Sequence, residues 1–417
     1  MQRVRMSLPY FKEFGWDAEV VVVDEAYSEI VRDRLLLQSI PSDIKIHKVK
    51  ALNKSWTSKF GLGSLALRSM WYYRKRVNLL LKTQKFDLIY FSTTQFPLCI
   101  LGAYWKKRFG VPYIIDMQDP WHSNYYKDKP KQQQPPKYWF SYRLNKYLEP
   151  IAMKSVDGLI SVSENYITIL KNRYPHIKNI PHATITFGAY SPDLKIAADN
   201  RESFPPLLNP AFKNIVYIGR GGADMYKALA VLFKTLKRAL DTNPGLFNKL
   251  RFYFIGTSYA PTGQGIPSVL PIAQEYGVQN SVIEITDRIS YYHTLLTLQQ
   301  ADALFIPGSD DPNYTASKIY PYLLTQKPLL AIFNSQSSVV SILNQCTLYV
   351  TVLSISGEDG ATDNKLYALL TGWADGDFQN IQLTNEFDNY SARCLALQQV
   401  AMFNQVIQNS EDKNTFN

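Results

Sequence analysis

The stretch that decides the fold is ADALFIPGSDDPNYTASKIYPYLLTQKPLLAIF, residues 301–333. It predicts a buried strand at 303–307, a polar loop, a helix that opens at Ser317 and Lys318, and a second apolar strand from Pro328. The free N–H groups at the start of a helix attract anions, and Ser317 and Lys318 add a hydroxyl and a cation. The segment therefore favours a phosphate or diphosphate site, although many α/β units have such turns and bind nothing there.

Short apolar runs separated by helical stretches recur on both sides of this segment. Apolar strands that alternate with helices indicate a parallel sheet covered on both faces. The sequence therefore predicts an α/β fold with two doubly wound, Rossmann-like domains facing a cleft. The predicted strands are residues 20–23, 88–91, 113–115, 159–162 and 184–187 in the first domain, and 215–218, 252–255, 282–285, 303–306, 329–333 and 348–352 in the second.

The domain boundaries follow from changes in composition. A polar, proline-bearing stretch predicts a linker. The first domain opens on a helix, residues 2–14, where a doubly wound domain should open on a strand, so it has either an unusual edge or a truncated start. The predicted parts are an N-terminal domain at 1–190, a linker at 191–210, a second domain at 211–388, a C-terminal helix at 389–408 that packs back on the first domain, and a disordered tail at 409–417.

Charge and cysteine content limit the kinds of site, location and partner that the chain can have. The 417-residue chain carries a net charge of +10 and three widely spaced cysteines. The cysteines argue against a disulfide framework or a zinc site and predict a reducing, cytoplasmic location. Residues 1–200 hold 30 Lys and Arg against 17 Asp and Glu, whereas the remainder is slightly acidic. This asymmetry indicates an anionic partner for the first half of the chain.

Nucleic acid is not the expected partner, because no recognition motif accompanies the positive charge. The segment from Trp56 to Lys82 mixes aromatic and basic side chains, which is typical of helices that lie on anionic lipid. The same pattern arises when an ordinary helix turns its aromatics toward its own sheet. Both interpretations stay open, and the first predicts peripheral association with the inner face of the cell membrane.

Six segments, taken in order, resemble glycosyltransferases of the GT-B fold, close to family 4 and its relatives. The resemblance covers nearly the whole chain, and each motif alone is weak. The segments are QRVRMSLPYFKEFGWDAEVVVVDE (2–25), FDLIYFSTTQFP (86–97), VPYIIDMQDPW (111–121), VDGLISVSENYITILKNRYP (156–175), IVYIGRGGADMYKALAVLF (215–233) and the opening stretch.

The resemblance implies that residues 1–190 form the acceptor-side domain and residues 211–388 the nucleotide-sugar-binding domain. The donor, a nucleotide-diphosphate sugar, is a substrate, and no cofactor or metal is expected. In the family, an arginine and a lysine after the first strand of the second domain hold the diphosphate, and Arg220 and Lys227 match them. The family's two glutamates in the nucleotide loop are replaced by Asn313 and Pro321, so ribose recognition falls to Tyr314 or Tyr320. The donor-binding residues implied are Arg220, Gly221, Lys227, Arg288, Thr315, Ser317 and Lys318.

On the acceptor side, the resemblance places a candidate general base at Asp119. Asp116 is expected to brace the turn, His122 is a second candidate base, and Trp121 offers an aromatic face for an acceptor or packs in the core. The implied activity is metal-independent transfer of a hexosyl-type sugar to a saccharide or lipid-linked acceptor, in bacterial surface polysaccharide biosynthesis. The alternatives are a non-catalytic or truncated binding protein of the same fold and a sugar-nucleotide epimerase.

Overall fold

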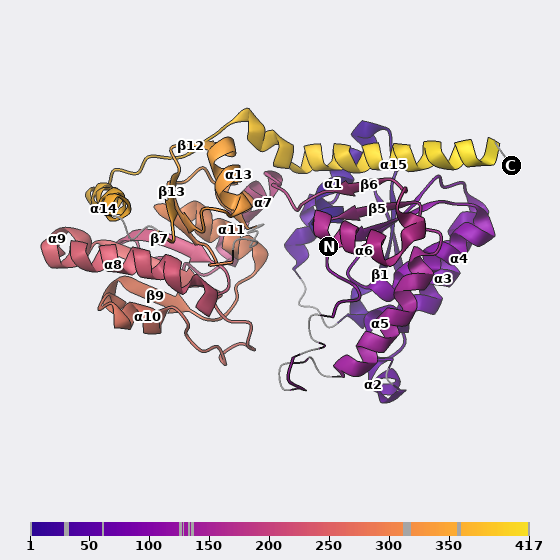
Figure 1. The fold of residues 1–417 in the computed structure, drawn as a ribbon, viewed down its shortest axis with the longest axis horizontal. Helices are drawn as coiled ribbons and strands as arrows, with labels where there is room; N and C mark the ends of the chain where they lie inside the picture. Colours follow the sequence, from indigo (N-terminus) through magenta and orange to yellow (C-terminus); the bar gives the residue numbers. More distant parts are fainter. Residues whose placement is uncertain are drawn as a thin grey trace. The chain divides into compact units, whose positions relative to one another are not determined.

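The computed structural model describes residues 2–28, 33–60, 62–124, 127, 129–131, 134, 137–311, 318–356 and 360–415. The chain divides into two compact units (Figure 1). Unit 1 comprises Met1–Phe187 and Ala392–Asn417, and unit 2 comprises Gly188–Ser391. The main sheet of each unit is parallel, with helices between the strands, so the predicted fold class, two Rossmann-like α/β domains, is confirmed.

Unit 1 begins with a helix, as the sequence predicts. Helix α1 ends just before a 3-10 turn that Gly15 closes with a left-handed φ of +83°. The elements of unit 1 are α1 (Gln2–Phe11), β1 (Glu19–Val23), β2 (Lys45–Val49), α2 (Lys54–Thr57), α3 (Leu65–Thr83), β3 (Ile89–Ser92), α4 (Ile100–Phe109), β4 (Tyr113–Met117), α5 (Tyr138–Met153), β5 (Gly158–Ser161), α6 (Glu164–Arg173), β6 (His182–Thr184) and α15 (Ala392–Thr415).

The strands of unit 1 form two separate parallel sheets, in the orders β1-β2 and β3-β4-β5-β6. Among the residues that the structure describes, β1 pairs only with β2, and β3 only with β4. Every side chain of β4 and β5 is buried, whereas all those of β1 and β3 stay partly exposed. Val20 of β1 and Tyr90 of β3 nevertheless pack in one apolar cluster with α1 and α15. The two sheets thus share a helical cover.

Helix α15, at the C-terminal end of the chain, completes this helical cover. It packs along α1 in Figure 1, and its Phe403 contacts the rings of Phe11, Trp16 and Tyr90. The helix continues to Thr415, so the predicted disordered tail at 409–417 is wrong over its described part. No glycine or proline interrupts residues 392–415, and the polar end therefore extends the helix.

Unit 2 contains one six-stranded parallel sheet, in the order β13-β11-β10-β7-β8-β9, and a small antiparallel pair, β12-β14. Its elements are α7 (Pro192–Asp199), β7 (Lys213–Ile218), α8 (Tyr226–Thr242), α9 (Pro244–Phe247), β8 (Leu250–Ile255), α10 (Leu270–Glu275), β9 (Val282–Ile285), α11 (Tyr291–Gln300), β10 (Ala303–Pro307), α12 (Ile319–Leu324), β11 (Leu329–Phe333), α13 (Ser338–Cys346), β12 (Thr347–Leu348), β13 (Thr351–Ser354), α14 (Gly360–Asp375) and β14 (Gln382–Leu383).

The predicted linker at 191–210 is not irregular, because it contains α7. Pro192 opens this helix, where a missing N–H costs nothing. Asp193 is buried and accepts hydrogen bonds from the hydroxyls of Tyr291 and Tyr292 on α11, each at 2.9 Å. These contacts make the segment part of unit 2.

No helix in the described part of the chain is both long enough and apolar enough to cross a membrane.

Candidate functional site

In the sheet of unit 2, the strand order reverses between two neighbouring central strands, β7 and β10. From β7 the chain continues to β8 and β9 on one side, and from β10 to β11 and β13 on the other. At such a point the loops after the two strands separate, and ligands of doubly wound sheets bind beyond the carboxyl ends there. Arg220 follows β7, and Lys318 follows β10 at the start of α12.

Lys318 has a strongly lowered pKa. Its Nζ atom donates a hydrogen bond to Tyr217 Oη at 2.8 Å. Burial, followed by the nearby cations Arg220 and Arg288, lowers the pKa of Lys318 to about 8. Gly219 leaves the space for this ammonium, since a Cβ atom at that position would lie 2.3 Å from Nζ. Three cationic side chains therefore act on one another at the carboxyl edge of the sheet.

Arg220 is held in place by Asp224. Its Nη1 and Nη2 atoms donate to the two carboxylate oxygens of Asp224 at 2.8 and 2.7 Å. These bonds lower the pKa of Asp224 to about 2, so the pair stays charged throughout the physiological range. Tyr217 Oη also donates to the backbone oxygen of Arg220 at 2.9 Å. Tyr217 thus connects the Arg220 loop to Lys318.

Of the remaining predicted donor residues, the structure describes Arg288, Lys227 and Gly221 but not Thr315 or Ser317. Arg288, after β9, lies over the ring of Tyr259 at 4.9 Å from its centroid. Lys227 is 63% exposed in the first turn of α8, 3.9 Å from a carboxylate oxygen of Asp310. Gly221 lies in the Arg220 loop, where a Cβ would meet Ser268 Oγ at 2.0 Å. Thr315, Ser317, Asn313 and Tyr314 lie outside the described residues.

Tyr320 does not suit the ribose contact that the sequence suggested. Its ring is buried and stacks on Tyr390 at 5.1 Å between centroids. Pro321 lies within α12, a helix of six residues, which is too short to supply a helix dipole of its own. The positive charge at this edge therefore comes from the cationic side chains rather than from a helix dipole.

In unit 1, Asp116 lies at the end of β4 and is fully buried. Its Oδ2 atom accepts hydrogen bonds from Tyr90 Oη, Ser92 Oγ and Gln118 Nε2 at 3.1, 2.9 and 3.0 Å. Arg3 Nε pairs with the same oxygen at 2.7 Å. A carboxylate enclosed in this way braces the carboxyl edge of the sheet and cannot reach a substrate.

Asp119 follows three residues later and is exposed. Although the side chain is exposed, desolvation by the surrounding protein raises the pKa of Asp119, which moves the carboxylate toward the range in which it can accept a proton. Trp121, in contrast, is a core residue, since it is 5% exposed and stacks on Phe96 at 5.6 Å. It therefore does not offer a free aromatic face.

A buried carboxylate, Glu149 on α5, fixes the loop that carries these residues. It accepts hydrogen bonds from the backbone N–H of His122 at 3.0 Å and the hydroxyl of Tyr174 at 2.9 Å, and it pairs with Arg173. Burial and the Arg173 charge lower the pKa of His122, which keeps its imidazole neutral near pH 7. The loop after β4 is thereby anchored to α5 and α6.

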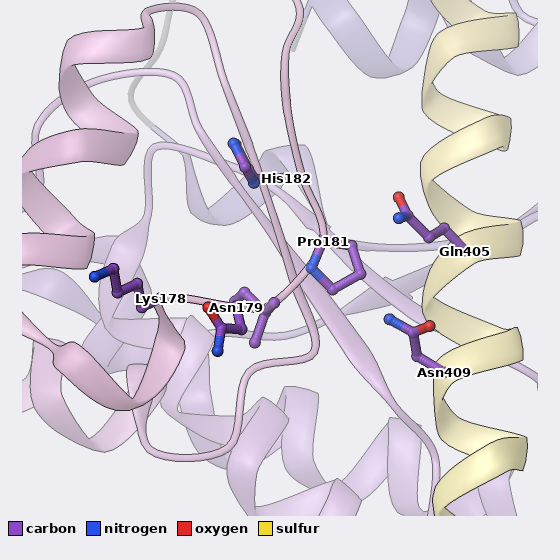
Figure 2. Close-up of a pocket in the computed structure, with 7 residues that line it drawn as sticks. Lys178, Asn179, Pro181, His182, Gln405 and Asn409 are labelled. Atoms are coloured by element: carbon purple, nitrogen blue, oxygen red, sulfur yellow. The ribbon is translucent and has the colours of Figure 1, made fainter.

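A polar cavity of about 290 Å³ lies elsewhere in unit 1, near the start of β6. Figure 2 shows Gln405 and Asn409 reaching from α15 toward Pro181. This cavity is at the amino ends of the parallel strands, opposite to the edge that carries Asp116 and Asp119. It is therefore not the site that the sequence predicts. Its lining residues are Lys178, Asn179, Ile180, Pro181, His182, Gln405 and Asn409.

Sequence reasoning missed Tyr217, Asp224 and Glu149. The four-residue spacing of Arg220 and Asp224 is a signal that was available, because it suits an arginine–carboxylate pair. Tyr217 reads as one more apolar residue of a strand, and Glu149 as a surface charge of a helix. Only the fold reveals their partners.

Comparisons with known proteins bear on the fold of the chain and on a part of unit 1. Residues 19–185 match the family model described as Glycosyltransferase Family 4. No curated protein matches the chain. Sucrose-phosphate synthase from Thermosynechococcus elongatus is similar in structure, with a TM-score of 0.51, 12% identity, and coverage of 97% of this chain and 92% of that one.

The N-terminal domain of trehalose-6-phosphate phosphatase from Candida albicans is similar with a TM-score of 0.53 and 10% identity, again over 97% of this chain and 92% of that one. At such low identity these two similarities show the fold alone.

Proposed function

We propose that this chain, which has the GT-B fold and matches glycosyltransferase family 4 over residues 19–185, transfers a sugar from a nucleotide-diphosphate donor to an acceptor hydroxyl. The observation that carries the proposal is the cationic group of unit 2. Lys318 and Arg220 lie after the two strands between which the strand order of the sheet reverses. Arg220 and Arg288 are both close enough to lower the pKa of Lys318.

The chemistry needs positive charge at the leaving group. When the bond between the sugar and the diphosphate breaks, negative charge develops on the diphosphate oxygen. Arg220 and Lys318 supply preorganised cations for that charge, so the transfer needs no metal ion. Asp119, on unit 1, takes the proton of the acceptor hydroxyl as the new glycosidic bond forms.

The acceptor we propose is a saccharide or a lipid-linked saccharide, in the synthesis of a bacterial surface polysaccharide, with a hexosyl-type donor. The basic first half of the chain supports an anionic, membrane-held acceptor. A cytoplasmic location belongs to the same proposal, and it fits three cysteines that form no disulfide with one another.

Nucleotide binding is the first test. UDP, GDP, ADP and CDP are added to the purified chain, and the melting temperature is measured for each. At least one should raise it, and Arg220→Ala should abolish the rise. If none raises the melting temperature, the donor site is wrong.

Turnover then separates the three functions that share this fold. The matching sugar nucleotide is incubated with the protein and a saccharide mixture, and free nucleoside diphosphate is measured. Acceptor-dependent release supports a transferase, and binding without release supports a non-catalytic protein. A changed sugar configuration on the recovered nucleotide would instead identify an epimerase.

A further inference from the structure

Helix α3 of unit 1 has a packed inner face and an exposed outer face. Its inner face packs on α4 and the sheet, in a cluster with Trp105. This face accounts for several of the aromatic and apolar residues that made the segment ambiguous in the sequence. The inner-face residues are Ala66, Met70, Tyr73, Val77 and Leu81.

The outer face carries a second set of large side chains, which we call the α3 stripe: Trp71, Lys75, Leu79 and Lys82. Their spacing of four, four and three residues places them on one side of the helix. Trp71 is 59% exposed and Leu79 is 50% exposed. Lys75 Nζ lies 5.3 Å from the centre of the Trp71 ring. The stripe therefore alternates interfacial apolar groups with cations.

The charge around the stripe is one-sided. Residues 44–115 contain 14 Lys and Arg and a single acidic residue, Asp87. Asp87 already pairs with Lys85 at 3.4 Å. Within the described residues, neither Lys75 nor Lys82 forms an ion pair with a carboxylate. A surface of this kind is complementary to a dense, negatively charged partner.

We propose that the α3 stripe docks unit 1 on an anionic lipid surface. Lysines at a bilayer interact with the headgroup charge, while Trp and Leu side chains enter the boundary between headgroups and acyl chains. A nucleic acid would engage the lysines, yet it would leave Leu79 exposed to water. Because the stripe combines apolar and basic side chains, it fits a lipid surface, which has both an apolar layer and negative charge, better than a nucleic acid, which has only the charge. Such docking would bring the enzyme to lipid-linked acceptors.

The test uses the full chain and sedimentation with vesicles. Vesicles of phosphatidylcholine alone are compared with vesicles that also contain phosphatidylglycerol. The protein should sediment with the second kind only, and added salt should release it. Lys75→Glu with Lys82→Glu should lower the partition constant at least tenfold, since each lysine near an anionic surface contributes about fivefold. Trp71→Ser with Leu79→Ser should lower it as well.

Matched controls come from unit 2. Lys195→Glu with Lys237→Glu makes the same change in net charge on exposed helices, and Ile266→Ser removes an apolar side chain that is 82% exposed. Both should bind vesicles like the parent.

Three results would overturn the proposal: no binding to anionic vesicles, equal loss in the controls, or tight binding to duplex DNA that the Trp71 and Leu79 variant retains. The nucleotide-dependent melting shift is unaffected by the stripe variants, so failure here is distinct from failure of the donor site.

Discussion

Lys318 predicts an unusual dependence of donor binding on pH. In the free protein its pKa is about 8, well below the ordinary value of 10.5, because the ammonium is buried beside Arg220. A lysine with a lowered pKa keeps its charge below pH 8 and loses it as the pH rises through 8. A diphosphate binds the charged form, so donor affinity should be full near pH 7 and fall above pH 8.

The size of the effect follows from the same pKa. At pH 9, about 90% of Lys318 is neutral, and recharging it on binding costs roughly 1.4 kcal/mol, which corresponds to about a tenfold weaker affinity than at pH 7. Calorimetric titration with UDP, or with whichever nucleotide raises the melting temperature, gives the affinity at each pH. Asp224 has a pKa of about 2 and contributes nothing in this window.

Lys318→Met is the decisive comparison. It should bind more weakly at pH 7 and show an almost flat profile between pH 7 and 9. Lys237→Met, on the exposed side of α8, is the matched control and should keep the parent profile. A tenfold fall that persists in Lys318→Met would mean that another group titrates, and the reasoning would be refuted.

Three further predictions concern other residues of the two units. Arg220→Ala should weaken nucleotide binding by about tenfold to a hundredfold in calorimetry, and Asp224→Asn by less, because it frees the arginine without removing its charge; equal losses would contradict this order. Asp119→Asn should lower kcat by about 10²–10⁴-fold in a turnover assay while nucleotide affinity stays the same, and a near-normal kcat would exclude it as the base. Glu149→Ala removes a buried carboxylate, leaves the Arg173, Tyr174 and His122 donors without their acceptor, and should cost about 3 kcal/mol of unfolding free energy in denaturant titration, whereas Glu202→Ala, at an 87% exposed side chain, should cost nothing measurable.

Most strands could be predicted because continuous apolar runs mark buried parallel strands. Strand β2, KIHKV, escaped this rule, since it lies at an edge and buries only Val49 completely. Helix α7 escaped for another reason. Its position depends on Asp193 meeting two tyrosines nearly a hundred residues away, and no local pattern records such a contact.

The residues of the candidate site likewise divide into those that the sequence predicts and those whose roles depend on tertiary contacts. The sequence supplied Arg220, Lys318 and Arg288 from a family pattern, and the fold places Lys318 close to the other two. The roles of Tyr217 and Asp224 depend on loop conformation, and Trp121 was ambiguous until its burial was known. Partners that meet only through tertiary structure are beyond a reading of one sequence.

The break between β1 and β3 also affects how unit 1 behaves in solution. Strand β1, EVVVV, has high β-propensity and pairs with β2 along one edge, and no described strand pairs with its other edge. A strand edge that no other strand pairs with can template the addition of foreign strands and seed aggregation. Amides of β1 and β3 should exchange with deuterium sooner than those of β4 and β5, and concentrated samples should aggregate first through unit 1. A valine-to-lysine change in β1 is therefore a rational step toward a better-behaved sample.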